Sequence, residues 1–235
     1  MQQNLLAFSP DEYLNGKLLL IDKPIGWTSF QVVGHIRNQL SRYIGIKKIK
    51  VGHSGTLDPL ATGLLLICTG KLTRDIEDFM GLNKCYSGLI KLGFTTLSYD
   101  AETPEIKGGS YEGLTFSEIT NKSKEFNGDI LQIPPNYSAV KQAGKRLYEL
   151  ARNGQENDIQ KVPRRVRIDS FIIKDYINGQ ASFSVCCSKG TYIRSLAHDF
   201  GQALTCGGYL TALRRESIGG YCVRDAITPK DWSQS

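Results

Sequence analysis

The stretch GHSGTLDPLATGLLLICTG, residues 52–70, joins a glycine-rich segment to an apolar one. Its first part, residues 52–63, is so rich in glycine and turn-forming residues that we expect it to lack regular structure. Its second part, LLLICTG, is a continuous apolar run, which predicts a buried strand. Pro59 disfavours the helical conformation at Asp58 and favours extended backbone there. The stretch therefore predicts a carboxylate held on an irregular loop just before a buried strand.

The chain before this stretch predicts a strand and a helix. KLLLID, residues 17–22, is an apolar run that ends at Lys23-Pro24, which indicates a second buried strand. Thr28 or Ser29 can cap the helix that follows, because a side-chain oxygen there can accept a backbone N–H of the first turn. The helix has an apolar stripe made of Val32, Val33, Ile36 and Leu40.

The rest of the chain alternates between strands and helices. Asn178-Gly179 predicts a tight turn between two strands. In order, we expect a short helix at about 73–80, a strand from near Tyr86, a polar loop at 95–113, a helix at 115–125, strands at 166–177 and 181–188, a helix over TYIRSLAHDFGQAL capped by Thr191, and a strand at 209–218. This mixture predicts an α+β (mixed α/β) fold with a central, mostly antiparallel sheet flanked by helices and loops. We expect one domain over residues 1–235.

The composition is that of an ordinary globular protein, with 40% hydrophobic and 22% charged residues. No run of about 20 apolar residues and no signal peptide is present, so we expect no membrane segment. The six cysteines form no CxxC pair, and several lie in apolar runs. We therefore expect reduced thiols and a cytoplasmic location. The three histidines show no zinc-ligand spacing with the cysteines, so we expect no metal.

Positive charge is concentrated in residues 141–167, where eight basic side chains face three acidic ones. One part of this segment, KRLYELARNG at 145–154, favours a helix, and Arg164, Arg165 and Arg167 add a second basic cluster. Such a surface binds an RNA backbone through its phosphates. A solvated exposed face is the alternative interpretation.

Asp58 is the first candidate for chemistry. A carboxylate on such a loop can act as a nucleophile, a general base or a metal ligand, although a lone Asp in a loop is more often a turn cap. A nucleotide-binding P-loop at Gly70-Lys71 is excluded, because Leu72 follows where Ser or Thr is needed.

GHSGTLDPLATGLL resembles the active-site motif of the TruB family of tRNA pseudouridine synthases nearly residue for residue. The other motifs of the family occur in the same order, so the resemblance covers about residues 17–221. They are LLLIDKPIGWTS at 18–29, KCYSGLIKLG at 84–93, GDILQIPPNYSAVKQAGKRLYELARNG at 128–154, CSKGTYIRSLAHDFG at 187–201 and LRRESIGGY at 213–221.

The resemblance implies isomerisation of the uridine at position 55, in the T loop of tRNA, without a cofactor. It makes Asp58 the catalytic aspartate, Tyr86 the tyrosine that stacks on the target base, and Arg194 the arginine that pairs with Asp58. A basic insert at about 128–167 is expected to close over the T arm. The implied substrate-binding residues are Lys23, Pro24, His53, Leu213, Tyr192, Lys145 and Arg146.

Without the resemblance, these side chains have ordinary structural interpretations. Tyr86 on a strand is by default a packing residue, and Arg194 on an amphipathic helix is by default a solvated surface charge. His53 could be a hydrogen-bonding residue in a turn, and Leu213 a core residue.

Two other functions compete with the isomerase. One is a tRNA-binding or folding module without catalysis, and the other is a hydrolase that cleaves a nucleoside glycosidic bond.

The route of the reaction stays open at this stage, since a carboxylate can attack the sugar or the ring, or assist removal of the 2′ proton. Each route needs Asp58 ionised, and the target base must leave its stack. Many family members have a further C-terminal RNA-binding domain. Only about fourteen residues follow Tyr221, so we expect no such domain here, and we expect a monomer.

Overall fold

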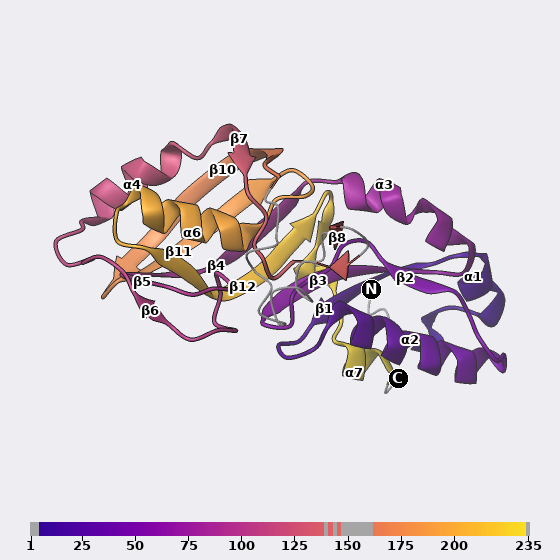
Figure 1. Cartoon of the computed structure of the whole chain (residues 1–235). Coiled ribbons are helices and arrows are strands. Elements are labelled where there is room, and N and C mark those ends of the chain that lie inside the picture. Colours follow the sequence, from indigo (N-terminus) through magenta and orange to yellow (C-terminus); the bar gives the residue numbers. More distant parts are fainter. Residues whose placement is uncertain (1–4, 139–140, 143–144, 147–161, 234–235) are drawn as a thin grey trace. The chain divides into compact units, whose positions relative to one another are not determined.

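The computed structural model describes residues 5–138, 141–142, 145–146 and 162–233 (Figure 1). The chain divides into two compact units. The first comprises Met1–Tyr86 and Leu213–Ser235, and the second comprises Ser87–Ala212. The chain passes from one unit to the other within two strands, β4 and β12. The organisation into a single domain, expected from the sequence, stays a prediction.

The sheet of the first unit has the strand order β1-β3-β12, with β2 also paired to β3 and β13 to β12. β1 and β2 run antiparallel to β3, while β12 runs parallel to it. The apolar run at 61–69 forms β3, which is buried along most of its length. The bounds are β1 Leu18–Lys23, β2 Val51–His53, β3 Ala61–Thr69, β12 Gly208–Ile218 and β13 Tyr221–Cys222.

The longest helix of the first unit, α2, begins after Thr28 as the sequence predicts. Thr28 accepts a hydrogen bond from the Gln31 backbone N–H, and Gln31 reaches back to the N–H of Thr28, which is a capping box. The predicted apolar stripe is buried and packs in one core with Trp232 of α7. The helices are η1 Leu5–Ala7, α1 Pro10–Asn15, α2 Ser29–Ile44, η2 Gly70–Asp75, α3 Ile76–Gly81, η4 Val223–Asp225 and α7 Pro229–Ser233.

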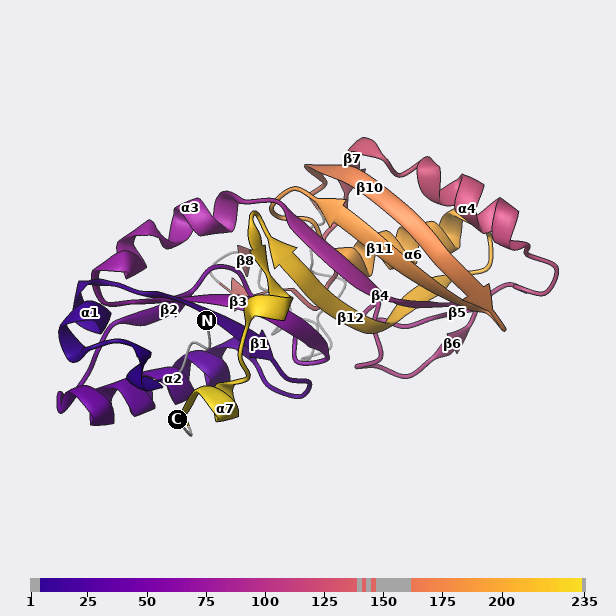
Figure 2. The same ribbon diagram turned by 180° about the vertical axis from the view of Figure 1, so that it is seen from behind.

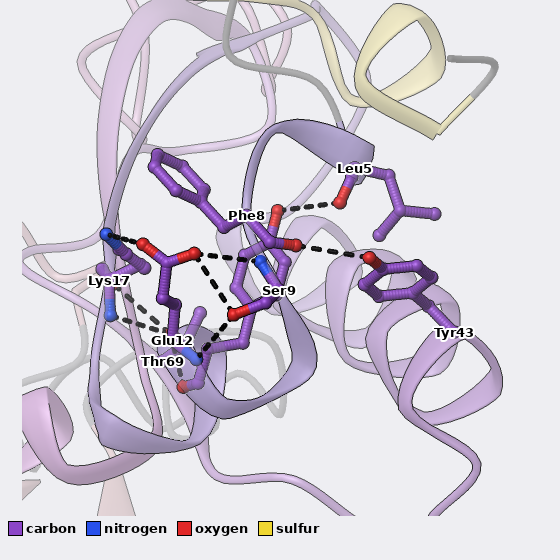
Figure 3. A network of polar contacts seen from close by, with 8 residues as sticks. Leu5, Phe8, Ser9, Glu12, Lys17, Tyr43 and Thr69 are labelled. Atoms are coloured by element: carbon purple, nitrogen blue, oxygen red, sulfur yellow. Dashed lines mark hydrogen bonds and ion pairs between the residues drawn. The ribbon is translucent and has the colours of Figure 1, made fainter.

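A polar network fixes the start of α1 in the first unit (Figure 3). Ser9 and Glu12 form a second capping box, and Glu12 also pairs with Lys17 at 2.8 Å. The backbone N–H of Lys17 donates to the Thr69 hydroxyl at the end of β3. The network therefore ties α1 to the sheet.

The sheet of the second unit has the order β12-β4-β11-β10-β7. Helices α4 and α6 lie on the same face of β10 and β11 (Figures 1 and 2). Edge-to-face contacts of Phe171 with Phe183 and Phe200 build the core beneath them. The elements are β4 Lys84–Leu92, β5 Phe94–Thr95, β6 Ile106–Lys107, α4 Phe116–Lys124, β7 Gly128–Gln132, β8 Lys141–Gln142, β9 Lys145–Arg146, β10 Arg164–Ile177, β11 Gln180–Cys187 and α6 Ile193–Ala203.

The mixed α/β fold with a mostly antiparallel sheet is confirmed, and so is the hairpin turn at Asn178-Gly179, where both residues have positive φ. Several local expectations were wrong. Residues 52–53 and 61–63 are strands rather than loop, because they pair within the sheet. The polar loop at 95–113 contains one strand of the β5–β6 hairpin.

The start of α6 also differs from the sequence prediction. Thr191 does not cap the helix; its hydroxyl donates to the Ser188 carbonyl, and Tyr192 is the N-cap residue. In the predicted helix at 145–154, Lys145 and Arg146 lie in β9, and residues 147–154 lie outside the described residues.

Four cysteines, Cys68, Cys187, Cys206 and Cys222, are free, as expected. Cys85 and Cys186 are disulfide-bonded, so the prediction of reduced thiols was wrong for these two. Among the described residues, no helix is long and apolar enough to cross a membrane, and no group of three or more potential metal-ligating side chains occurs.

Candidate active site

Asp58 lies half-buried on the loop between β2 and β3, and the backbone on both sides of it is fixed. The Asp58 carbonyl accepts a hydrogen bond from the Ala61 N–H at 3.1 Å, which closes a β-turn with Pro59 at its second position. On the other side, the buried Ser29 hydroxyl accepts from the Leu57 N–H at 2.8 Å and donates to the Leu57 carbonyl at 3.0 Å. The position of Asp58 is thus set from α2 and from its own turn.

Lys23, the last residue of β1, is fully buried and contacts the backbone of the same loop. Its ammonium donates to the carbonyls of Pro24 at 3.0 Å, Trp27 at 2.6 Å and Pro59 at 3.4 Å. Three acceptors match the three N–H bonds of a protonated lysine. The predicted pair Lys23-Pro24 therefore supports the Asp58 loop through its backbone.

Arg215 of β12 holds the start of the loop and is 1% exposed. Its Nε donates to the Leu64 carbonyl at 2.7 Å, and its Nη2 donates to the Gly55 carbonyl at 3.2 Å. β3 and β12 approach closely at Gly63, where an added Cβ would lie 2.3 Å from the Arg215 carbonyl oxygen. Only glycine fits at residue 63, which also has a φ of +105°.

The charges around the loop influence one another. Burial lowers the pKa of Lys23 to about 8, which the negative charge of Asp58 opposes and the positive charge of Arg215 reinforces. Lys23 is therefore mostly protonated at neutral pH.

His53, the last residue of β2, is kept neutral by its surroundings. Burial lowers its pKa, the charge of Arg215 adds to that effect, and the Gly55 backbone opposes it. Its Nδ1 atom is buried and makes no hydrogen bond of ordinary geometry within the described part of the chain.

Two other predicted residues of the first unit, Tyr86 and Leu213, lie on β4 and β12. Tyr86 is the third residue of β4 and is 8% exposed. Leu213 of β12 is half-buried and pairs in register with Ala61, three residues after Asp58. Its carbonyl accepts a bond from the Thr62 hydroxyl at 3.5 Å. Leu213 is therefore connected to the Asp58 loop through its pairing with the first residue of β3.

Arg194 belongs to the second unit, where it lies in the first turn of α6 and is 6% exposed. Its guanidinium donates to the carbonyls of Ser98 at 3.1 Å and Tyr137 at 2.9 Å. Its Nε lies 3.7 Å from a carboxylate oxygen of the buried Asp100. The expectation of a solvated surface charge is therefore wrong, while its pairing with Asp58 stays a prediction.

The remaining predicted residues also lie in the second unit. Gln132 of β7 fixes Tyr192, because its side-chain amide bonds to both the N–H and the carbonyl of Tyr192, at 2.7 and 3.0 Å. Lys145 and Arg146 form β9, which pairs with β8.

Sequence reasoning missed three residues that position the site. Arg215 lies in the motif LRRESIGGY, where the alternation of side chains along a strand could have indicated it. Adjacent strand residues face opposite sides, so one arginine of the pair must point inward. Ser29 was considered only as a helix cap, and Asp100 only as part of a loop. Their contacts join residues far apart in the chain, which no local pattern indicates.

A model of the TruB family pseudouridylate synthases (N-terminal domain) matches residues 42–193. The chain belongs to the TruB family. It is 49% identical to tRNA pseudouridine synthase B of Flavobacterium johnsoniae over 220 residues, which cover 93% of this chain and 95% of that protein. It is 43% identical to the protein of the same name from Bacteroides fragilis strain YCH46, with 94% of each covered.

Solved structures share the fold. A chain in the crystal structure of a Cbf5-Nop10-Gar1 complex superposes with a TM-score of 0.69 at 27% identity, covering 99% of this chain. This chain spans 60% of the length of that one. A chain of an H/ACA RNP bound to a substrate RNA containing 2′-deoxyuridine superposes with a TM-score of 0.68 at 23% identity, covering 100% of this chain and 61% of that one.

Proposed function

We propose that this protein converts the uridine at position 55, in the T loop of tRNA, to pseudouridine, with Asp58 as the essential carboxylate. The observation that carries the proposal is the fixed backbone around Asp58. Ser29 holds Leu57 on one side, and Lys23 with the Gly26 N–H holds the Pro59 carbonyl on the other. A carboxylate positioned before substrate binds needs no reorganisation during the reaction.

The reaction breaks the bond between N1 of uracil and C1′ of ribose, turns the base, and joins C5 to C1′. The proton on C5 then leaves, and N1 gains a proton, so the atoms balance without a co-reactant. Cleavage develops positive charge at C1′, which an adjacent carboxylate stabilises. Asp58 serves whether it attacks the sugar, attacks the ring or assists loss of the 2′ proton.

We also propose roles for the other predicted residues. Tyr86 would stack on the flipped base, which offsets part of the few kcal/mol needed to extrude it. Arg194 would pair with Asp58, and Leu213 would line the uracil pocket. His53, neutral at physiological pH, would contact the extruded nucleotide. Tyr192, Lys145 and Arg146 would contact the RNA beyond the target.

The test is analysis of the nucleosides after a T-arm stem-loop RNA is incubated with the protein. The wild type should form pseudouridine in an intact strand, and Asp58→Asn should form none. Asp78→Asn, an exposed aspartate of α3, is the matched control and should behave as the wild type. Release of free uracil would instead identify a glycosidic hydrolase, and binding without any product would identify a tRNA-binding module.

A further inference from the structure

A groove in the first unit takes no part in the active site described above. It has a volume of about 350 Å³ and lies between α2, residues 48–52 and the segment from η2 to α3. The residues that matter for its chemistry are Arg37, Lys48, Lys50, Gly52, Thr73 and Ile76.

The groove is strongly positive. Arg37, Lys48 and Lys50 form no ion pair with an acidic side chain in the described part of the chain, and the segment 37–50 has five basic residues and no acidic one. Cations gathered in this way repel one another, so an anion that enters the groove relieves that repulsion.

Hydrogen bonding and packing hold the walls of the groove in place. Arg37 donates one hydrogen bond from Nη2 to the Val51 carbonyl at 3.2 Å, which places its guanidinium over β2 and leaves other N–H groups for a ligand. A Cβ added at Gly52 would lie 2.6 Å from the Cδ1 atom of Ile76, so a side chain there would displace the wall. Ile76 therefore packs directly against the backbone of Gly52.

We propose that this groove binds the phosphodiester backbone of the RNA strand beside the target nucleotide. Lys50, Val51 and Gly52 lead directly along β2 to His53, so the groove begins next to a residue proposed to contact that nucleotide. An arginine fork with two lysines suits phosphate oxygens, which take bidentate and point-charge contacts together. The location rests on the proposed function, whereas the phosphate chemistry rests on the groove alone.

The test compares two double variants from the same basic segment. Lys48→Gln with Lys50→Gln removes two groove cations, and Arg42→Gln with Lys47→Gln removes two exposed cations outside the groove. Binding of a fluorescent T-arm stem-loop RNA is measured by anisotropy over a range of salt concentrations. The groove variant should bind at least about tenfold more weakly, with the salt slope reduced by about 2, and the control by less than about threefold. Equal losses in both variants would overturn the proposal, since charge alone would then explain the binding.

A second measurement keeps the test independent of folding. Uncharged methylphosphonate linkages are placed one at a time through the stem-loop RNA. The wild type should lose affinity at one or two linkages, and the groove variant should lose little or no affinity when those same linkages are neutralised. Losses that are identical for both proteins at every linkage would refute the phosphate contact. An acidic peptide whose binding depends on Lys48 and Lys50, while RNA affinity is unchanged, would also refute it and point to a protein partner.

The outcome is separable from that of the proposed function. Binding by anisotropy needs no catalysis, so the groove can be confirmed even if no pseudouridine forms. The kcat of the groove variant at saturating RNA should stay within about twofold of the wild type, because these cations touch no reacting atom.

Discussion

Each unit buries a cation that holds backbone carbonyls, and the two cations differ in their partners. Lys23 in the first unit faces three carbonyls. Arg194 in the second unit faces two carbonyls and the Asp100 carboxylate. A lysine can lose its proton when burial outweighs attraction, whereas an arginine keeps its charge in proteins. The support of the Asp58 loop therefore includes a cation that burial drives towards its neutral form, whereas the cation of the second unit is an arginine.

The largest effect is expected at Arg215, another buried cation of the first unit. Arg215→Ala removes two charge-assisted bonds, leaves the Leu64 and Gly55 carbonyls without them and opens a cavity. We expect a loss of about 3–4 kcal/mol in the free energy of unfolding, measured in denaturant. Arg214→Ala is the matched control, because that side chain is 38% exposed and pairs with Asp22. It should cost about 1 kcal/mol or less; equal costs would show that burial is not what matters.

Next in size is the pH response of Lys23. The unfolded chain releases this proton near its ordinary pKa of 10.5, and the folded chain near 8. Between these values the unfolded state binds more protons, so the stability of the wild type rises with pH. Relative to Lys23→Met, the wild type should gain about 1–3 kcal/mol from pH 7 to pH 10.5. If the stability difference between the wild type and Lys23→Met does not change over this range, the contrast between Lys23 and Arg194 is refuted.

A smaller effect is expected from Ser29, whose hydroxyl holds both backbone groups of Leu57. Ser29→Ala should cost about 1–2 kcal/mol in unfolding free energy and lower kcat about tenfold with little change in KM, because Asp58 loses part of its positioning. Ser41→Ala, farther along α2, is the control. It should leave the unfolding free energy close to that of the wild type and kcat within about twofold. If Ser29→Ala lowers stability while kcat is unchanged, the two hydrogen bonds between Ser29 and Leu57 have a structural role only.

The smallest effect is expected at the exposed network of Figure 3. The bond from Lys17, followed by the bonds from Ser9, lowers the pKa of Glu12 to about 2. Because that pKa is depressed, the stabilisation is present above about pH 4.5 and is lost as the pH falls towards 2. Glu12→Gln should therefore lower the melting temperature slightly at pH 7 and not at pH 2. A difference that persists at pH 2 would contradict this role.

The sequence predicted those elements whose signals are local. Thr28 caps α2 because its oxygen needs only a neighbour three residues on, and Asn178-Gly179 turns because both residues tolerate positive φ. Gly52 and Gly63 misled the prediction, since pairing with other strands overrides their weak preference for irregular backbone. Thr191 failed as a cap because α6 begins one residue later than expected, with Tyr192 at the N-cap position.

The chemical residues proposed for the site stay predictions, and the residues that support the Asp58 loop were missed. Asp58, Tyr86 and Arg194 were found through a resemblance to the motifs of a family. Arg215 and Asp100 act on groups that are distant in sequence, so their importance becomes visible only when the strands are assembled.

The central claim is tested most directly by single-turnover tritium release from a T-arm stem-loop RNA labelled at C5 of uridine. Wild type and Asp58→Asn are compared at saturating protein, with RNA affinity measured on the same preparations. We predict that Asp58→Asn binds within about threefold of the wild type and releases tritium at least about 10⁴-fold more slowly. Release at a rate close to that of the wild type would contradict the account, because the fixed carboxylate would then not be the essential group.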